Sequence, residues 1–243
     1  MRLPFQGSIE RRRVRLALSP QDRARLTTLR LRAKQRARED RSTVAGLLSL
    51  ARFVAMDLET TGPNMMRDRI ISIGAVAVVE RAVRHDDAFE VVVRQASESR
   101  ADNILIHQIG GQEQRAGVEP MEALLSFLEF LDGSIAVAFR SEFDSTVLGR
   151  ELQDSLGIRA GPRFLDLASM LPALFPNTPN DSLDDWARYF GLPPIGRHHA
   201  IADAYANAQL LLLALEKAQR IRLATTTNLL DLDKSQRWLG RRR

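Results

Sequence analysis

Three apolar runs at short spacing constrain the fold of this chain more than any other feature. Phe53–Leu58, Ile70–Val79 and Ala88–Val93 each have the length and apolar content of a β-strand. The short connections between them favour antiparallel pairing, because a parallel pair needs a crossover of a dozen or more residues. The sequence therefore predicts that these three strands form an antiparallel sheet.

Helical and short strand patterns alternate in the second half of the sequence. Ile135–Phe139 and Phe164–Leu167 have the composition of short buried strands, whereas Pro120–Leu131 and Ala200–Ala218 have helical apolar spacing. Three more helices are predicted, from about 143 to 156, from the strand at 164 to near Pro172, and over Ser182–Phe190 between a Ser182 cap and Gly191. Antiparallel strands followed by alternating helices and strands indicate the α/β class, a mixed sheet flanked by helices.

Charge divides the chain into three parts. Residues 1–50 hold 13 Lys and Arg against four Asp and Glu, residues 51–220 hold 16 against 24, and residues 221–243 hold six against two. We therefore expect a basic, largely helical extension at 1–50, the α/β domain at 51–220 and a basic tail at 221–243. Basic ends around an acidic middle suggest a polyanionic partner, and solvated surface is an equally good explanation.

The basic extension carries its own helical signals. Ser19 can cap a helix with Pro20 at its first position. Leucines at loosely helical spacing then predict one or two helices, packed on the domain or on a partner. The basic side chains of this extension that could bind such a polyanion are Arg11–Arg13, Arg25, Arg30, Arg32, Lys34, Arg36 and Arg38.

Composition excludes several classes of site. The chain has no cysteine, which rules out disulfides, zinc sites with thiolate ligands and cysteine nucleophiles. No apolar run approaches the ~20 residues that a membrane-spanning helix needs, and no uninterrupted apolar segment of a signal peptide is present. We therefore expect no membrane association and a cytoplasmic location.

Four carboxylates and a histidine fall where the predicted topology brings them together. Asp57 and Glu59 project from one face at the end of the first strand, a costly arrangement unless a cation lies between them. Asp144 follows the strand 135–139, Asp203 lies in the first turn of the last long helix, and His198 precedes it by five residues. Each residue alone has an ordinary structural explanation, as a helix cap or a surface side chain. Together they favour a metal site.

These residues also resemble a known family. Asp57-Leu58-Glu59-Thr60-Thr61-Gly62, then Phe143-Asp144, then His198-His199-Ala200-Ile201-Ala202-Asp203-Ala204 resemble the three motifs of DnaQ-like 3′–5′ exonucleases of the DEDDh subtype. These enzymes have the ribonuclease H-like fold and include the proofreading epsilon subunit of bacterial DNA polymerase III. The resemblance runs from about Phe53 to Leu215. The segment Ile106–Gly110 is also similar to the one before the family's first sheet-covering helix.

The resemblance implies a site with two Mg²⁺ or Mn²⁺ ions. Asp57 and Asp203, helped by Glu59, would hold the ion that activates water, and Asp57 and Asp144 would hold the second. His198 would accept the proton of the attacking water. The residues implied in substrate binding are Thr60 and Thr61, which would grip the 3′-terminal nucleotide through their backbone, and Phe143, which would stack on a base or belong to the core.

Three positions depart from the family pattern. Arg140 stands where the family often has Asn, and it could contact a phosphate or pair with Glu142. Pro63 replaces an aliphatic residue, and His199 has no assigned role. Substrate preference therefore stays open. We expect single-stranded or frayed 3′ ends, DNA rather than RNA, and the alternatives are an RNA-trimming enzyme or a non-catalytic tethering module. A DNA polymerase or another protein is a second candidate partner, through residues 1–50.

Overall fold

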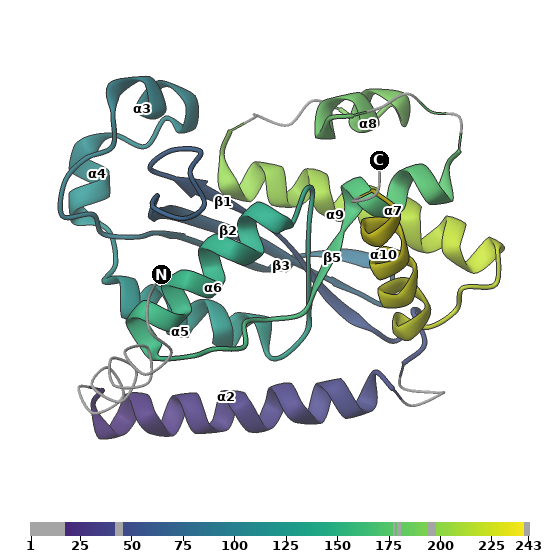
Figure 1. The fold of residues 1–243 in the computed structure, drawn as a ribbon, viewed down its shortest axis with the longest axis horizontal. Coiled ribbons are helices and arrows are strands. Elements are labelled where there is room, and N and C mark those ends of the chain that lie inside the picture. Colours follow the sequence, from purple (N-terminus) through teal and green to yellow (C-terminus); the bar gives the residue numbers. More distant parts are fainter. Residues whose placement is uncertain (1–17, 42–45, 177, 179–180, 194–197, 241–243) are drawn as a thin grey trace.

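A mixed five-stranded sheet with helices on both faces forms the centre of the computed structural model, which describes residues 18–41, 46–176, 178, 181–193 and 198–240 (Figure 1). The strand order is β3-β2-β1-β4-β5. The strands are β1 (Arg52–Thr60), β2 (Ile70–Val79), β3 (Ala82–Val92), β4 (Ile135–Ala138) and β5 (Phe164–Asp166). β1 pairs antiparallel with β2 and parallel with β4, which confirms the predicted mixed sheet.

The third strand begins six residues earlier than the sequence indicated. β2 and β3 are joined by the two-residue turn Glu80-Arg81, whose φ angles are 51° and 61°. Positive φ at both central residues is typical of the tight hairpin turns that match strand twist. Asn and Gly usually signal such a turn, and neither is present here. The predicted strand Ala88–Val93 is therefore only the second half of β3.

The helices form two layers. They are α2 (Pro20–Glu39), α3 (Ala101–His107), α4 (Gly111–Ala116), α5 (Pro120–Leu131), α6 (Glu142–Leu156), α7 (Leu167–Leu174), α8 (Leu183–Tyr189), α9 (Ala200–Arg220) and α10 (Thr226–Gly240). α5 and α6 cover one face of the sheet, and α7 to α10 cover the other. α3, α4 and α10 have no counterpart among the predicted helices, and α7 continues two residues past Pro172. None of the helices described is long and apolar enough to cross a membrane.

Alternation along β1 explains the two layers. Val54, Met56 and Leu58 contribute to the core under α5 and α6, whereas Phe53 and Ala55 contribute to the core under α9. Successive side chains of a strand point to opposite faces, so Asp57 and Glu59 continue the row that faces α9.

The helix of the basic extension packs on the domain. As predicted, Ser19 caps α2, with Pro20 in the first turn. Arg25 donates to both Glu122 and Glu129, at 2.7 Å each, and Arg36 pairs with Asp132. Leu26 and Leu29 are buried and belong to the same hydrophobic cluster as the buried side chains of α5 and α6. Arg25 and Arg36 were candidates for binding a polyanionic partner, and in the structure they pair with carboxylates that attach α2 to the domain. Arg11–Arg13, also candidates, lie outside the described residues.

The region expected as a basic tail contains a second docked helix. α10 buries Leu229 in the core under α9. Its Asp233 accepts a hydrogen bond from the Ser169 hydroxyl of α7. The last helix is therefore packed against α7 and β5.

Candidate active site

Three of the four predicted carboxylates meet at the end of β1. Asp57 and Glu59 are half-buried on the face toward α9, and Asp203 is buried in the first turn of that helix. One carboxylate oxygen from each residue lies within 4.8 Å of the other two. Three hard oxygen ligands at this spacing fit a divalent cation such as Mg²⁺ or Mn²⁺.

A glycine in β2 allows α9 to bring Asp203 this close. Gly74 lies directly opposite Asp57 in the sheet, and the start of α9 passes over it. A Cβ atom at Gly74 would lie 2.1 Å from the carbonyl carbon of Ala200. One turn beyond Asp203, the buried Asn207 donates from Nδ2 to the Met56 carbonyl at 3.0 Å. Neither residue was predicted from the sequence, although a glycine inside an apolar strand often marks a close backbone approach.

Asp144, the fourth predicted carboxylate, is not part of this group and comes from the opposite layer. It is 5% exposed in the first turn of α6, and its carboxylate accepts a hydrogen bond from the Leu58 backbone N–H. Burial, assisted by the nearby Asp166 carboxylate, raises the pKa of Asp144 to about 7. The carboxylate therefore contacts β1 at the residue that follows Asp57, and burial disfavours its charged form in the absence of a cation.

Side chains from β5 and α10 hold the turn that carries Asp144. Arg140 has a φ of 57°, and its backbone N–H donates to Asp166 Oδ1 at 2.9 Å. Ser141, fully buried, accepts a hydrogen bond of 3.2 Å from Arg237, which is paired in turn with Asp233. No motif in the sequence links residues 233 and 237 to residue 141, so these supports could not be found before the fold was known.

The two predicted substrate contacts on this turn have other partners. The Arg140 guanidinium donates to the Asp181 carbonyl at 2.9 Å, and within the described residues it forms no ion pair with Glu142. Phe143 is half-buried and packs against the core under α5 and α6. Their roles in substrate binding stay predictions.

His198 lies two residues before the start of α9, the helix that carries Asp203. It is exposed, its φ is 61°, and its backbone N–H donates to Asp203 Oδ2 at 3.2 Å. This bond places the residue directly against the third carboxylate, as the spacing of five residues suggested. Its neighbour His199 lies near Glu90 of β3, with Nδ1 at 3.4 Å from Oε1.

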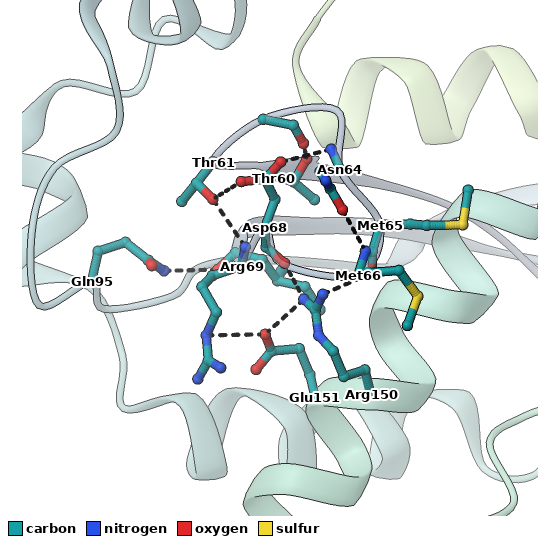
Figure 2. A network of polar contacts seen from close by, with 12 residues as sticks. Thr60, Thr61, Asn64, Met65, Met66, Asp68, Arg69, Gln95, Arg150 and Glu151 are labelled. Carbon is teal, nitrogen blue, oxygen red and sulfur yellow. Dashed lines mark hydrogen bonds and ion pairs between the residues drawn. The ribbon is translucent and has the colours of Figure 1, made fainter. Parts of the chain in front are cut away.

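The loop that follows β1 is fixed by ion pairs and hydrogen bonds from α6 (Figure 2). Asp68 accepts from the Thr61 hydroxyl and from the Asn64 backbone N–H. Arg150 donates to the Met65 and Asp68 carbonyls, and the buried Glu151 pairs with Arg69 at 3.1 Å. α6 therefore holds the loop that follows the strand end carrying Asp57 and Glu59.

Thr60 and Thr61 use several of their polar groups within the protein. The Thr60 carbonyl accepts from Asn103 of α3 at 2.6 Å, and the Thr61 N–H donates to the Arg69 carbonyl at 2.9 Å. The predicted grip on a 3′-terminal nucleotide therefore needs groups other than these two.

A family model described as exonuclease (RNase_T) matches residues 54–211, which include all three motifs. The chain belongs to this exonuclease family. The resemblance found in the sequence and the predicted ribonuclease H-like architecture are thereby confirmed.

Curated relatives of this exonuclease domain include much longer proteins. DNA polymerase III PolC-type of Caldanaerobacter subterraneus is 30% identical over 179 residues, which cover 73% of this chain and 12% of that protein. The PolC-type polymerase of Thermotoga maritima is 30% identical over 76% of this chain and 13% of its own. The 3′-5′ exonuclease DinG of Staphylococcus aureus is 26% identical over 79% and 21%. The chain thus spans a small part of each relative.

Solved structures share the fold of the exonuclease domain. E. coli exonuclease I, in complex with a dA16 oligonucleotide, matches with a TM-score of 0.59 at 18% identity, over 70% of this chain and 42% of the other. Exonuclease X, in complex with 5′ overhanging duplex DNA, matches with a TM-score of 0.58 at 19% identity, over 76% and 99%. At this level of identity the comparison establishes the architecture alone.

Proposed function

We propose that this chain is a metal-dependent 3′–5′ exonuclease that releases nucleotides from nucleic-acid 3′ ends. The observation that carries the proposal is the meeting of Asp57, Glu59 and Asp203 within 4.8 Å, in a chain of the exonuclease family. Carboxylates gathered at this spacing repel one another, and a divalent cation bound between them relieves that repulsion.

The proposed metal ligands come from both layers of the fold. Asp57, Glu59 and Asp203 would hold one Mg²⁺ or Mn²⁺ ion, and Asp144 would join Asp57 in holding a second. When bound, such ions supply Lewis-acid stabilisation of the charge on the reacting phosphate. Gly74 and Asn207 keep α9 at β1, and the turn at 140–141 presents Asp144 from the other layer.

The proposed substrate is a single-stranded or frayed DNA 3′ end. Exonuclease I and exonuclease X, which share the fold, were solved with DNA. RNA trimming by the same chemistry is the runner-up, since nothing in the sequence reads a 2′-hydroxyl decisively. A cytoplasmic location fits the absence of cysteines, and association with a DNA polymerase would parallel the PolC-type relatives.

Stepwise shortening of labelled strands tests the function. The protein is incubated with Mg²⁺ or Mn²⁺ and with 5′-labelled and 3′-labelled single-stranded DNA and RNA, beside Asp57→Ala and the exposed control Asp154→Ala. A 5′-labelled ladder that disappears in Asp57→Ala and EDTA, but not in Asp154→Ala, is expected. Absence of cleavage with either ion, while strands still bind, would favour the tethering module instead.

His198→Ala should slow cleavage by ~10²–10⁴-fold, the usual contribution of a general base. His198 is exposed and contacts Asp203 through its backbone, so the substitution leaves the carboxylate group in place. Single-turnover rates at saturating metal measure the loss, and the rise in melting temperature on adding Mn²⁺ reports metal binding. A variant with the parent rate would assign the base to another group.

A further inference from the structure

Six of the seven cations of α2 fall into two sets with different surroundings, and Arg30 belongs to neither set. Arg25, Arg32 and Arg36 pair with carboxylates of α5 and of Asp132 just after it. Arg23, Lys34 and Arg38 are exposed, and among the described residues they form no ion pair. The first set attaches the helix to the domain. The second set is left with its charge toward solvent.

The exposed set lies on one side of the helix. At 3.6 residues per turn, Arg23, Lys34 and Arg38 fall within an arc of about 60° and extend over about 22 Å. The three cations lie about 16 Å and about 6 Å apart along the helix axis, so each could contact a different phosphate of one nucleic-acid strand.

A groove runs beside this row. It has a volume of about 340 Å³ and lies between α2 and the segment 158–163 that follows α6. Leu26, Leu29 and Ile158 contribute its apolar floor, and Arg30 and Lys34 line it from α2. Arg163, paired with Asp40, lines the opposite side, and Arg159 is exposed in the same segment. Its cationic rims attract phosphates, and because no described residue that lines this groove is aromatic, bases would lie against aliphatic side chains.

We infer that this groove and its row of cations bind single-stranded nucleic acid at a distance from the carboxylate site. The inference rests on the proposed function, since it supplies the strand that the site would shorten. Asp144 stands at the start of α6, and α6 ends at Leu156, two residues before the groove-lining Ile158. Fifteen helical residues place the groove roughly 20 Å from the site. Figure 1 shows α2 along the outer side of α5 and α6.

The test compares two triple variants of the full chain. Arg23→Gln, Lys34→Gln and Arg38→Gln are combined in one protein. Arg81→Gln, Arg222→Gln and Lys234→Gln, which are exposed and lie outside α2, form the charge-matched control. Binding of a single DNA strand of about 20 nucleotides, long enough to span site and groove, is measured in EDTA across a salt series, so that the strand is not cleaved.

The α2 variant should bind about tenfold more weakly at about 0.1 M salt. The slope of log K against log salt concentration should become shallower by about two, because each of the three lost phosphate contacts contributes ~0.7. The control should keep more of the parent slope. Cleavage of a dinucleotide, too short to reach the groove, should be the same in all three proteins. Equal affinity and an equal salt dependence for the two triple variants would overturn the inference. The exposed cations of α2 would then be candidates for contact with a protein partner. Failure of the proposed function has a different signature, the absence of dinucleotide cleavage by the parent.

Discussion

Asp144→Asn is expected to abolish cleavage and, in the absence of metal, to raise the melting temperature above that of the parent protein at about pH 8. The carboxylate is 5% exposed, and burial raises its pKa to about 7. An asparagine keeps an oxygen that can accept from the Leu58 N–H, removes the buried charge, and loses one anionic ligand of the proposed metal site.

The gain in melting temperature on substituting Asp144 should depend on pH in a defined direction. An acid whose pKa is raised by folding binds more protons in the folded state, so stability is lost as the pH rises from about 4 to about 7. A shift of this size corresponds to an energy on the order of 4 kcal/mol. The difference between variant and parent should therefore be smaller at about pH 5 than at about pH 8, and should stay constant at higher pH.

Melting curves in EDTA at both pH values, with single-turnover cleavage in Mg²⁺, measure the two effects. Asp154→Asn is the control, because Asp154 is exposed on the same helix. A lower melting temperature for Asp144→Asn at the higher pH would show that the charged carboxylate stabilises the fold. Cleavage at the parent rate would remove Asp144 from the metal site.

The sequence predicted the parts of the fold that local patterns determine. Apolar runs indicated all five strands, and short connections predicted the antiparallel pairing of the first three. The Ser19 and Ser182 caps and Gly191 located helix ends, because capping depends on residues within one turn. Motif order located the carboxylates, and strand alternation placed Asp57 and Glu59 on one face.

Features that depend on contacts between distant segments could not be predicted. Arg25 and Arg38 look equivalent in the sequence, yet one pairs with α5 and the other is exposed. The support of Ser141 by Arg237 joins residues 96 positions apart. The Glu80-Arg81 turn lacks the usual glycine, so the first half of β3 was missed.

Gly74→Ala is expected to separate Asp203 from the carboxylates of β1. The added Cβ would lie 2.1 Å from the Ala200 carbonyl carbon, a backbone atom, so relief requires α9 or β2 to move. Overpacking of this kind costs about 1–3 kcal/mol. A displacement of ~1 Å at a catalytic group can cost ~10²-fold in rate.

Three measurements distinguish this effect from a general loss of stability. Gly149→Ala is the matched control, because a Cβ at Gly149 meets nothing within 4 Å. The control should melt no lower than the parent and cleave at the parent rate, since alanine favours a helix more than glycine does. Gly74→Ala should melt at a lower temperature, gain less on adding Mn²⁺, and cleave about 10²-fold more slowly at a temperature where it is fully folded. If the folded variant responded to Mn²⁺ and cleaved like the parent, the close approach of α9 at Gly74 would not be what assembles the carboxylates.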